Sequence, residues 1–135
     1  MFGGVQMRPN LHMQDMVDLY CLLLEVPDEK IAGQIFNAGY QNYSVAETAE
    51  VVRKVVQEEM PEKGEIEIVT TPSDDIRSYR INSDKIQRVL GFVPRHTIED
   101  GARDLIKAFK AGKLPDSMSD TRYSNIKTMK AVHLK

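Results

Sequence analysis

The stretch Gln34–Glu59, QIFNAGYQNYSVAETAEVVRKVVQEE, decides the predicted fold class. Its first five residues, Gln34–Ala38, are typical of a short strand closed by a glycine. Ser44 precedes Glu47 by three residues, which is the spacing of a capping box and predicts a helix to the end of the stretch. The residues expected to face inward are Ala49, Val52, Val55 and Val56. A strand followed by a capped helix predicts an α/β or α+β fold.

Earlier parts of the chain predict a further helix and several short strands. Asp15 is placed to cap a helix that ends at Pro27, and its apolar stripe holds Met16, Val17, Leu19, Tyr20, Leu23 and Leu24. Extended segments are predicted at Val5–Met7, Ile66–Thr70 and Tyr79–Ile81.

Two more helices are predicted toward the C-terminus. Ser83 caps a short helix, and Gly91 stands where a helix-ending glycine belongs. Thr97, with Asp100 three residues later, begins a helix whose apolar face holds Ile98, Ala102, Leu105, Ile106 and Phe109. The tail is polar, with a weak helical signal from Tyr123 to Val132.

Composition and charge exclude several classes of protein. The 135 residues suit one domain, and 41% apolar with 28% charged residues excludes wholesale disorder. The net charge of −2 gives no basic excess for nucleic-acid or membrane binding. The single cysteine excludes an intrachain disulfide. No stretch reads as a membrane span or a secretory signal, so we expect a cytoplasmic protein.

Motifs for cofactor, metal and nucleophile chemistry are absent or weak. The chain has no G-x-G-x-x-G or P-loop pattern. Its histidines lie in separate segments, which argues against a metal site. Cys21 lies within an apolar helix, which predicts a buried, inert thiol. Tyr123 and Lys127 have the spacing of an acid–base pair, but they lie in the polar tail, so an exposed pair is expected.

The best local constellation combines Arg8 with Asp75, Arg77, Tyr79 and Arg80. Arginine forks bind phosphate oxygens in bidentate fashion, and a tyrosine adds a flat apolar face. Such residues in two loops suit a diphosphate-linked ligand. A set of surface ion pairs, each contributing little, is the alternative that the residues alone leave open.

Ordered motifs in the same regions resemble the extended short-chain dehydrogenases/reductases, the NAD(P)-dependent nucleotide-sugar epimerases and dehydratases. They include RPNLHMQDMV at 8–17, similar to R-x-x-x-H-x-x-D-hydrophobic, and GQIFNAG at 33–39, similar to G-x-x-[FY]-N-[VIA]-G. SVAETA at 44–49 resembles the helix start that follows that strand. DIRSYRINSDKI at 75–86 looks like the substrate loop running into a D-x-S-K helix, followed by LGFVP at 90–94 and TIEDG at 97–101.

The resemblance covers only the C-terminal part of that family and implies a small mixed α+β lobe that binds the substrate. Residues 1–112 correspond to this lobe, and 113–135 form a polar tail with a weak helical signal. By the resemblance, Arg8 and the Asp75–Tyr79 loop contact the nucleotide diphosphate, with Arg77 as a phosphate ligand. Asp75 and Tyr79 are expected to shape the same pocket. The stretch 71–74, TPSD, departs from the Arg-Pro-Gly-Asp-like pattern of many relatives.

The resemblance further implies that the catalytic Tyr-x-x-x-Lys pair and the loop that binds NAD or NADP belong to a Rossmann domain missing from this chain. The expected function is therefore the substrate-binding fragment of an isomerase or lyase of this family. We expect this chain alone to bind no cofactor, and to self-associate through an exposed interface. A stand-alone nucleotide-sugar binding or regulatory module is the alternative, and a structural oligomerisation domain is a weaker third.

Overall fold

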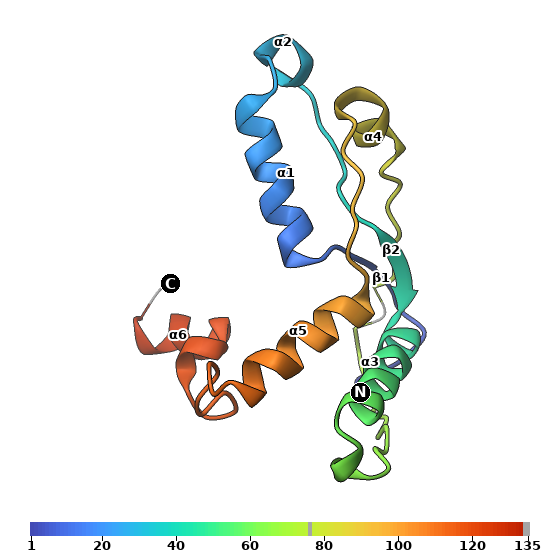
Figure 1. The fold of residues 1–135 in the computed structure, drawn as a ribbon, viewed down its shortest axis with the longest axis vertical. Helices are drawn as coiled ribbons and strands as arrows, with labels where there is room; N and C mark the ends of the chain where they lie inside the picture. Colours follow the sequence, from blue (N-terminus) through green and yellow to red (C-terminus); the bar gives the residue numbers. More distant parts are fainter. Residues whose placement is uncertain (76, 134–135) are drawn as a thin grey trace. The chain divides into compact units, whose positions relative to one another are not determined.

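The computed structural model describes residues 1–75 and 77–133 (Figure 1). The chain divides into two compact units, Met1–Asp104 and Leu105–Lys135. The first unit contains a two-stranded sheet and most of the helices. The predicted mixed α and β class is confirmed. No helix in the described ranges is long and apolar enough to cross a membrane.

An antiparallel pair of strands brings distant parts of the first unit together. Strand β1 (Met7–Asn10) pairs with β2 (Gln41–Ser44), with Met7 opposite Ser44 and Asn10 opposite Gln41. Strand β1 begins two residues later than the start of the predicted Val5–Met7 segment and includes Pro9, which an edge strand tolerates. Strand β2 was not predicted because its sequence, QNYS, has no apolar alternation.

The other predicted strands are wrong. Gln34–Ala38 and Ile66–Thr70 lie outside any strand, and Tyr79–Ile81 is likewise irregular. Next to the second of these, one isolated bridge joins Phe2 to Thr71. A strand needs a neighbour to satisfy its backbone N–H and C=O groups, and no such neighbour for these segments lies among the described residues.

Helix α3 (Val45–Glu59) confirms the capping box predicted from the sequence. The Ser44 hydroxyl accepts from the Glu47 backbone N–H at 3.1 Å, and the Glu47 carboxylate accepts from the Ser44 backbone N–H at 2.7 Å. These bonds lower the pKa of Glu47. Val55 is 1% exposed as predicted, whereas Val52 is exposed and its inward assignment is wrong. The 3₁₀ turn η1 (Pro61–Lys63) follows.

Helix α1 (Met13–Glu25) starts earlier than predicted, because His12 and not Asp15 caps it. The ring Nδ1 of His12 accepts from the Gln14 backbone N–H at 3.1 Å. Asp15 instead lies inside the helix, buried. After the predicted stop at Pro27, a single turn forms α2 (Asp28–Ile31).

The core of the first unit lies between α1 and α4 (Asp84–Leu90). Leu19, Ile86 and Phe92 form its centre, with partly buried Leu22, Leu23, Phe36, Ala38 and Leu90 around them. Phe36 and Ala38 belong to the irregular segment between α2 and β2 that Figure 1 shows. Gly91 ends α4 in the left-handed conformation at φ 70°, as predicted. The Ser83 hydroxyl does not cap α4 but accepts from the Gly39 N–H at 2.9 Å.

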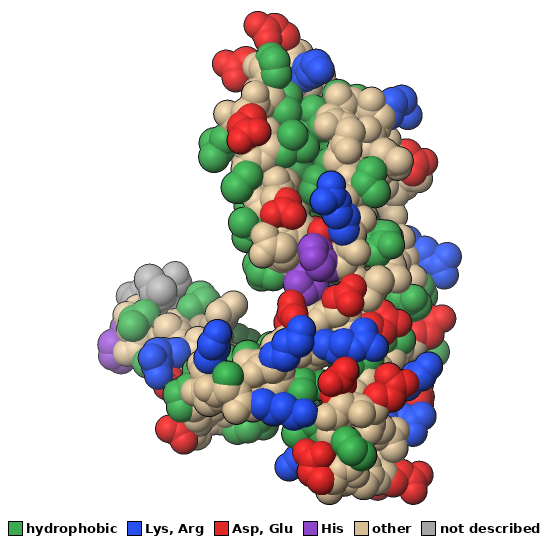
Figure 2. All heavy atoms as spheres, viewed as in Figure 1, with side chains coloured by type: hydrophobic (Ala, Val, Ile, Leu, Met, Phe, Trp, Pro, Cys, Tyr) green, Lys and Arg blue, Asp and Glu red, His purple; other side chains and the backbone are tan. Residues whose placement is uncertain are grey.

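Helix α1 is apolar on its outer side as well. Its exposed residues include Met13, Val17, Tyr20 and Leu24, spaced four, three and four residues apart, and we call these four the α1 stripe. Figure 2 shows hydrophobic side chains along this helix. Cys21 is exposed too, so the predicted buried thiol is wrong. An exposed row of large apolar side chains is typical of a surface that other protein covers.

Helix α5 (Ile98–Lys110) begins as predicted. The Thr97 hydroxyl accepts from the Asp100 N–H at 3.3 Å, and the Asp100 carboxylate accepts from the Thr97 N–H at 2.9 Å. Of the predicted inward residues, Ala102 and Ile106 are buried, whereas Leu105 and Phe109 are more than half exposed.

The second unit contains η2 (Thr121–Tyr123) and α6 (Asn125–Ala131). The helical signal in the tail is confirmed over α6. Tyr123 and Lys127 belong to different elements, so they do not share one continuous helix face. No cluster of three metal-ligating side chains occurs within 1–75 and 77–133.

Candidate functional site

The side chain of Arg8 extends from β1 toward the segment around Arg77, 69 residues further along the chain. Its Nη1 donates to the backbone carbonyl of Arg77 and, at 3.0 Å, to that of Met7. Its Nη2 lies 3.4 Å from Oδ2 of Asp75. The Arg8 guanidinium therefore joins strand β1 to the loop around Arg77.

Asp75 and Arg77 form a bidentate pair within the loop. Nε of Arg77 donates to Oδ1 of Asp75 and Nη2 donates to Oδ2, each at 2.8 Å. The Arg77 backbone N–H also donates to Oδ1, at 3.2 Å. The Arg77 guanidinium holds the pKa of Asp75 well below its usual range, and Asp75 in turn raises the pKa of Arg77. The Arg77 side chain is 81% exposed, so solvent reaches this pair.

Tyr79 completes the group. The guanidinium carbon of Arg8 lies 5.3 Å from the centre of the Tyr79 ring, within the range of a cation–π contact. The four predicted site residues, Arg8, Asp75, Arg77 and Tyr79, are therefore brought together. Arg80 has no contact with the Arg8 guanidinium among the described residues, and Ile76, within the motif, lies outside them.

Polar side chains outside the predicted set attach the loop around Arg77 to the sheet and to the segment just before β1. Gln6, which is 7% exposed, donates from Nε2 to the backbone carbonyl of Asp75 at 2.9 Å and accepts from the Gly4 N–H at 2.6 Å. Asn42 forms two bonds with the backbone of Ile81, each at 3.0 Å. The Ser78 hydroxyl accepts from the Met7 N–H at 3.0 Å. Sequence analysis missed these residues because their bonds to the loop span 39 to 71 residues of the chain.

This arrangement suits the binding of an anion. Two guanidiniums and one carboxylate leave one net positive charge beside an aromatic face. Guanidinium forks match phosphate oxygens in geometry and charge.

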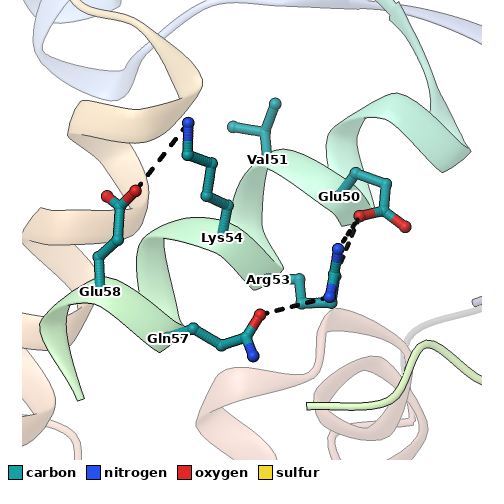
Figure 3. Close-up of a pocket in the computed structure, with 6 residues that line it drawn as sticks. All are labelled: Glu50, Val51, Arg53, Lys54, Gln57 and Glu58. Carbon is teal, nitrogen blue, oxygen red and sulfur yellow. Dashed lines mark hydrogen bonds and ion pairs between the residues drawn. The ribbon is translucent and has the colours of Figure 1, made fainter. Parts of the chain in front are cut away.

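A hollow along α3 contains none of the predicted site residues. Figure 3 shows it lined by Glu50, Val51, Arg53, Lys54, Gln57 and Glu58, and its volume is about 520 Å³. Its cations already have acidic or amide partners. Arg53 bonds to Glu50 at 2.6 Å and to Gln57 at 3.3 Å, and Lys54 lies 4.0 Å from Glu58. These pairs are ordinary neighbours on one helix face and indicate no ligand.

Three comparisons place these observations among known proteins. No model of a protein family matches the chain. The dTDP-glucose 4,6-dehydratases of Shigella flexneri and Escherichia coli are each 29% identical over 113 residues. The match covers 80% of this chain and 30% of either relative, so the chain spans about 30% of the length of these relatives.

Solved structures show the same fold. RMD from Pseudomonas aeruginosa complexed with NADPH superposes with a TM-score of 0.65 at 22% identity, covering 82% of this chain and 35% of that one. L-threonine dehydrogenase from Clostridium difficile gives a TM-score of 0.60 at 15% identity, covering 81% and 35%. The resemblance seen in the motifs is confirmed: this chain is similar to one part of nucleotide-sugar enzymes of the extended short-chain dehydrogenase/reductase type.

Proposed function

We propose that this chain is the substrate-binding lobe of an NAD(P)-dependent nucleotide-sugar epimerase or dehydratase, and that Arg8 and Arg77 grip the diphosphate of the substrate. The observation that carries the proposal is the bond from the Arg8 guanidinium to the backbone of Arg77 across 69 residues. It sets two arginines and the Tyr79 ring around one place on the surface. A bidentate fork at each side of a diphosphate can neutralise its charge and fix its orientation.

The chain contains a second Asp-x-Arg pair, which indicates that an Asp-x-Arg ion pair is not by itself a binding site. Arg122 binds Asp120 from Nε at 2.9 Å and from Nη2 at 2.6 Å, much as Arg77 binds Asp75. Among the described residues, no second guanidinium or stacked ring joins that pair. Arg8 and Tyr79 are therefore what distinguishes the proposed site from a surface ion pair.

The relatives support the substrate class and the kind of cofactor. The matched dehydratases act on dTDP-glucose by name, and RMD was solved with NADPH. This chain has no glycine-rich dinucleotide loop, so NAD(P) does not fit its residues. The lobe contributes binding energy and orientation of the sugar nucleotide, while a nucleotide-binding domain supplies the hydride chemistry.

Two features of the lobe support a second domain that covers it. The α1 stripe leaves four large apolar side chains exposed on the outer side of a helix whose inner side is already in the core. The backbone N–H groups of residues 35–38 have no hydrogen-bond partner among the described residues. About 70% of each matched relative has no counterpart in this chain, which leaves ample length for such a domain.

Calorimetric titration with dTDP tests the proposal. We expect weak, saturable binding that falls about tenfold or more in Arg8→Ala and in Arg77→Ala, since a hydrogen bond to a charged group contributes about 1.5–3 kcal/mol. Arg122→Ala is the matched control, because it removes the same kind of paired arginine elsewhere, and it should bind as the wild type does. Equal affinity in all four proteins, or no binding in any, would overturn the proposal.

A further inference from the structure

We infer that Asp75 is an internal competitor for the diphosphate: its carboxylate occupies the place between the two guanidiniums that a phosphate group takes on binding. This inference rests on the proposed function and assigns Asp75 a role opposite to that of a ligand contact. Its consequence is that removing the charge of Asp75 tightens anion binding.

The contacts of the carboxylate carry the argument. Oδ2 of Asp75 accepts from Nη2 of Arg77 at 2.8 Å and lies 3.4 Å from Nη2 of Arg8, so one oxygen faces both cations. Oδ1 fills the remaining edge of the Arg77 fork at 2.8 Å. A phosphate group binds an arginine fork through the same pair of N–H groups. Diphosphate and Asp75 therefore cannot both hold the Nε–Nη2 edge of Arg77.

Exchange of partners at this place costs little. Arg77 is 81% and Asp75 38% exposed in their side chains, so water can solvate both groups when the pair opens. Ion pairs exposed to solvent contribute little to stability, because water and salt screen the attraction. A phosphate group, with more charge than a carboxylate, can therefore displace Asp75 from Arg77 without a large penalty.

One backbone group of the loop, the Arg77 N–H, donates to the Asp75 carboxylate, and an asparagine Oδ1 can still accept that bond. The bonds that hold the loop on β1 do not involve the carboxylate. Gln6 holds the backbone carbonyl of Asp75, Ser78 accepts from Met7, and Tyr79 donates its backbone N–H to the carbonyl of Met7 at 3.3 Å. These bonds remain when Asp75 becomes asparagine, and asparagine can still accept one bond from Arg77. Asp75→Asn therefore changes the net charge of Arg8, residue 75 and Arg77 from +1 to +2, while the hydrogen bonds from the loop to Gln6 and Met7 remain.

Titration with inorganic pyrophosphate and with dTDP at low salt tests the inference. We expect Asp75→Asn to bind both roughly fivefold more tightly, since a unit charge at about 4 Å in water is worth about 1 kcal/mol. Asp74→Asn makes the same charge change in the same loop, and the Asp74 carboxylate forms no ion pair or hydrogen bond with the other described residues. Asp120→Asn opens the other Asp-x-Arg pair. Neither control should gain more than about twofold.

The outcomes separate the two proposals. If wild type binds and Asp75→Asn binds equally or more weakly, the inference is wrong and the proposed function stands. If no variant binds pyrophosphate or dTDP, both are wrong. If only Asp75→Asn binds, Asp75 is a competitor and the wild-type lobe does not grip the diphosphate by itself.

A measurement on the wild type guards against a variant that fails to fold. In a nitrogen-15 NMR titration with pyrophosphate, the Nε–H signal of Arg77 should shift, because its partner changes from carboxylate to phosphate. The Nε–H signal of Arg122 serves as the internal control and should stay in place. An unmoved Arg77 signal at saturation would contradict displacement of Asp75.

Discussion

The carboxylate of Asp15 lies 2.7 Å from Nδ1 of His96, a residue 81 positions further along the chain. It also accepts from the backbone N–H groups of Arg95 at 3.1 Å and of His96 at 3.0 Å. The His96 ring stacks on that of His12, with centroids 4.8 Å apart. Asp15 therefore ties α1 to the turn before α5 within the first unit.

The pKa values of this pair move in opposite directions. Burial raises the pKa of Asp15, but the hydrogen bonds from the His96 ring and from the backbone of His96 and Arg95 outweigh burial and lower it. The hydrogen bond to Asp15 raises the pKa of His96, and Asp100 and Asp18 add to the shift. A lowered carboxyl pKa stabilises the fold above the ordinary value of 3.8, and a raised imidazole pKa stabilises it below the ordinary value of 6.5.

The pair should therefore stabilise the protein most between about pH 4 and pH 6.5. We expect the difference in Tm between wild type and His96→Ala to be largest in that window and to shrink as pH rises through the raised pKa of His96. Thermal unfolding followed by circular dichroism from pH 4.5 to 9 measures it. His133→Asn is the control for loss of one imidazole, and its Tm difference should not vary with pH in this way. A difference for His96→Ala that grows above pH 7 would contradict the sign of the linkage.

Ile86 tests where the core lies. It is 1% exposed and packs with Leu19 and Phe92. Ile86→Ala should lower the free energy of unfolding by about 2–5 kcal/mol, because it removes buried methyl groups and leaves a cavity. Urea unfolding measures this loss, and Ile126→Ala is the control because Ile126 is 68% exposed. Equal losses in the two variants would place the core elsewhere.

Sequence patterns correctly predicted the helix ends that are fixed by hydrogen bonds between near neighbours in the chain. They gave wrong predictions where a residue's partners lie far away in the sequence. The Ser44 and Thr97 caps and the Gly91 stop were predictable because their partners lie within a few residues. Asp15 was misassigned as a cap because its partners, Arg95 and His96, are some 80 residues away.

The strand errors have the same origin. Gln34–Ala38 has the composition of a strand, but a strand also needs a neighbour, and in this chain the segment packs Phe36 and Ala38 into the core without pairing. At the candidate site, the residue types of Arg8, Arg77 and Tyr79 indicated anion binding in advance. Gln6 and Asn42, which anchor the loop, carry no local signal, since their bonds span 69 and 39 residues.

The anchors should matter for binding although they need not touch the ligand. Gln6→Leu removes the bond to the carbonyl of Asp75 while filling similar space, so the loop should lose its fixed position. We expect the affinity for dTDP to fall several-fold, with a smaller effect in Gln57→Leu, which changes the same residue type on α3. Unchanged affinity in Gln6→Leu would mean that the loop keeps its position without this bond.

The α1 stripe should make the isolated chain self-associate. Sedimentation velocity at increasing concentration should show a reversible rise in mean mass, because large apolar side chains stay in water only at a cost. Tyr20→Glu with Leu24→Glu should abolish the rise, since charges on the stripe disfavour its burial. Val69→Glu, at a residue that is 61% exposed away from α1, should leave it unchanged. A wild-type chain that stays monomeric at high concentration would count against an exposed interface.

The most direct test of the proposed grip on the diphosphate is an experimental structure of this chain with dTDP. We expect phosphate oxygens within hydrogen-bond distance of both the Arg8 and the Arg77 guanidiniums, with the Asp75 carboxylate moved off the Nε–Nη2 edge of Arg77. A diphosphate bound elsewhere, with the Asp75–Arg77 pair intact at 2.8 Å, would contradict it.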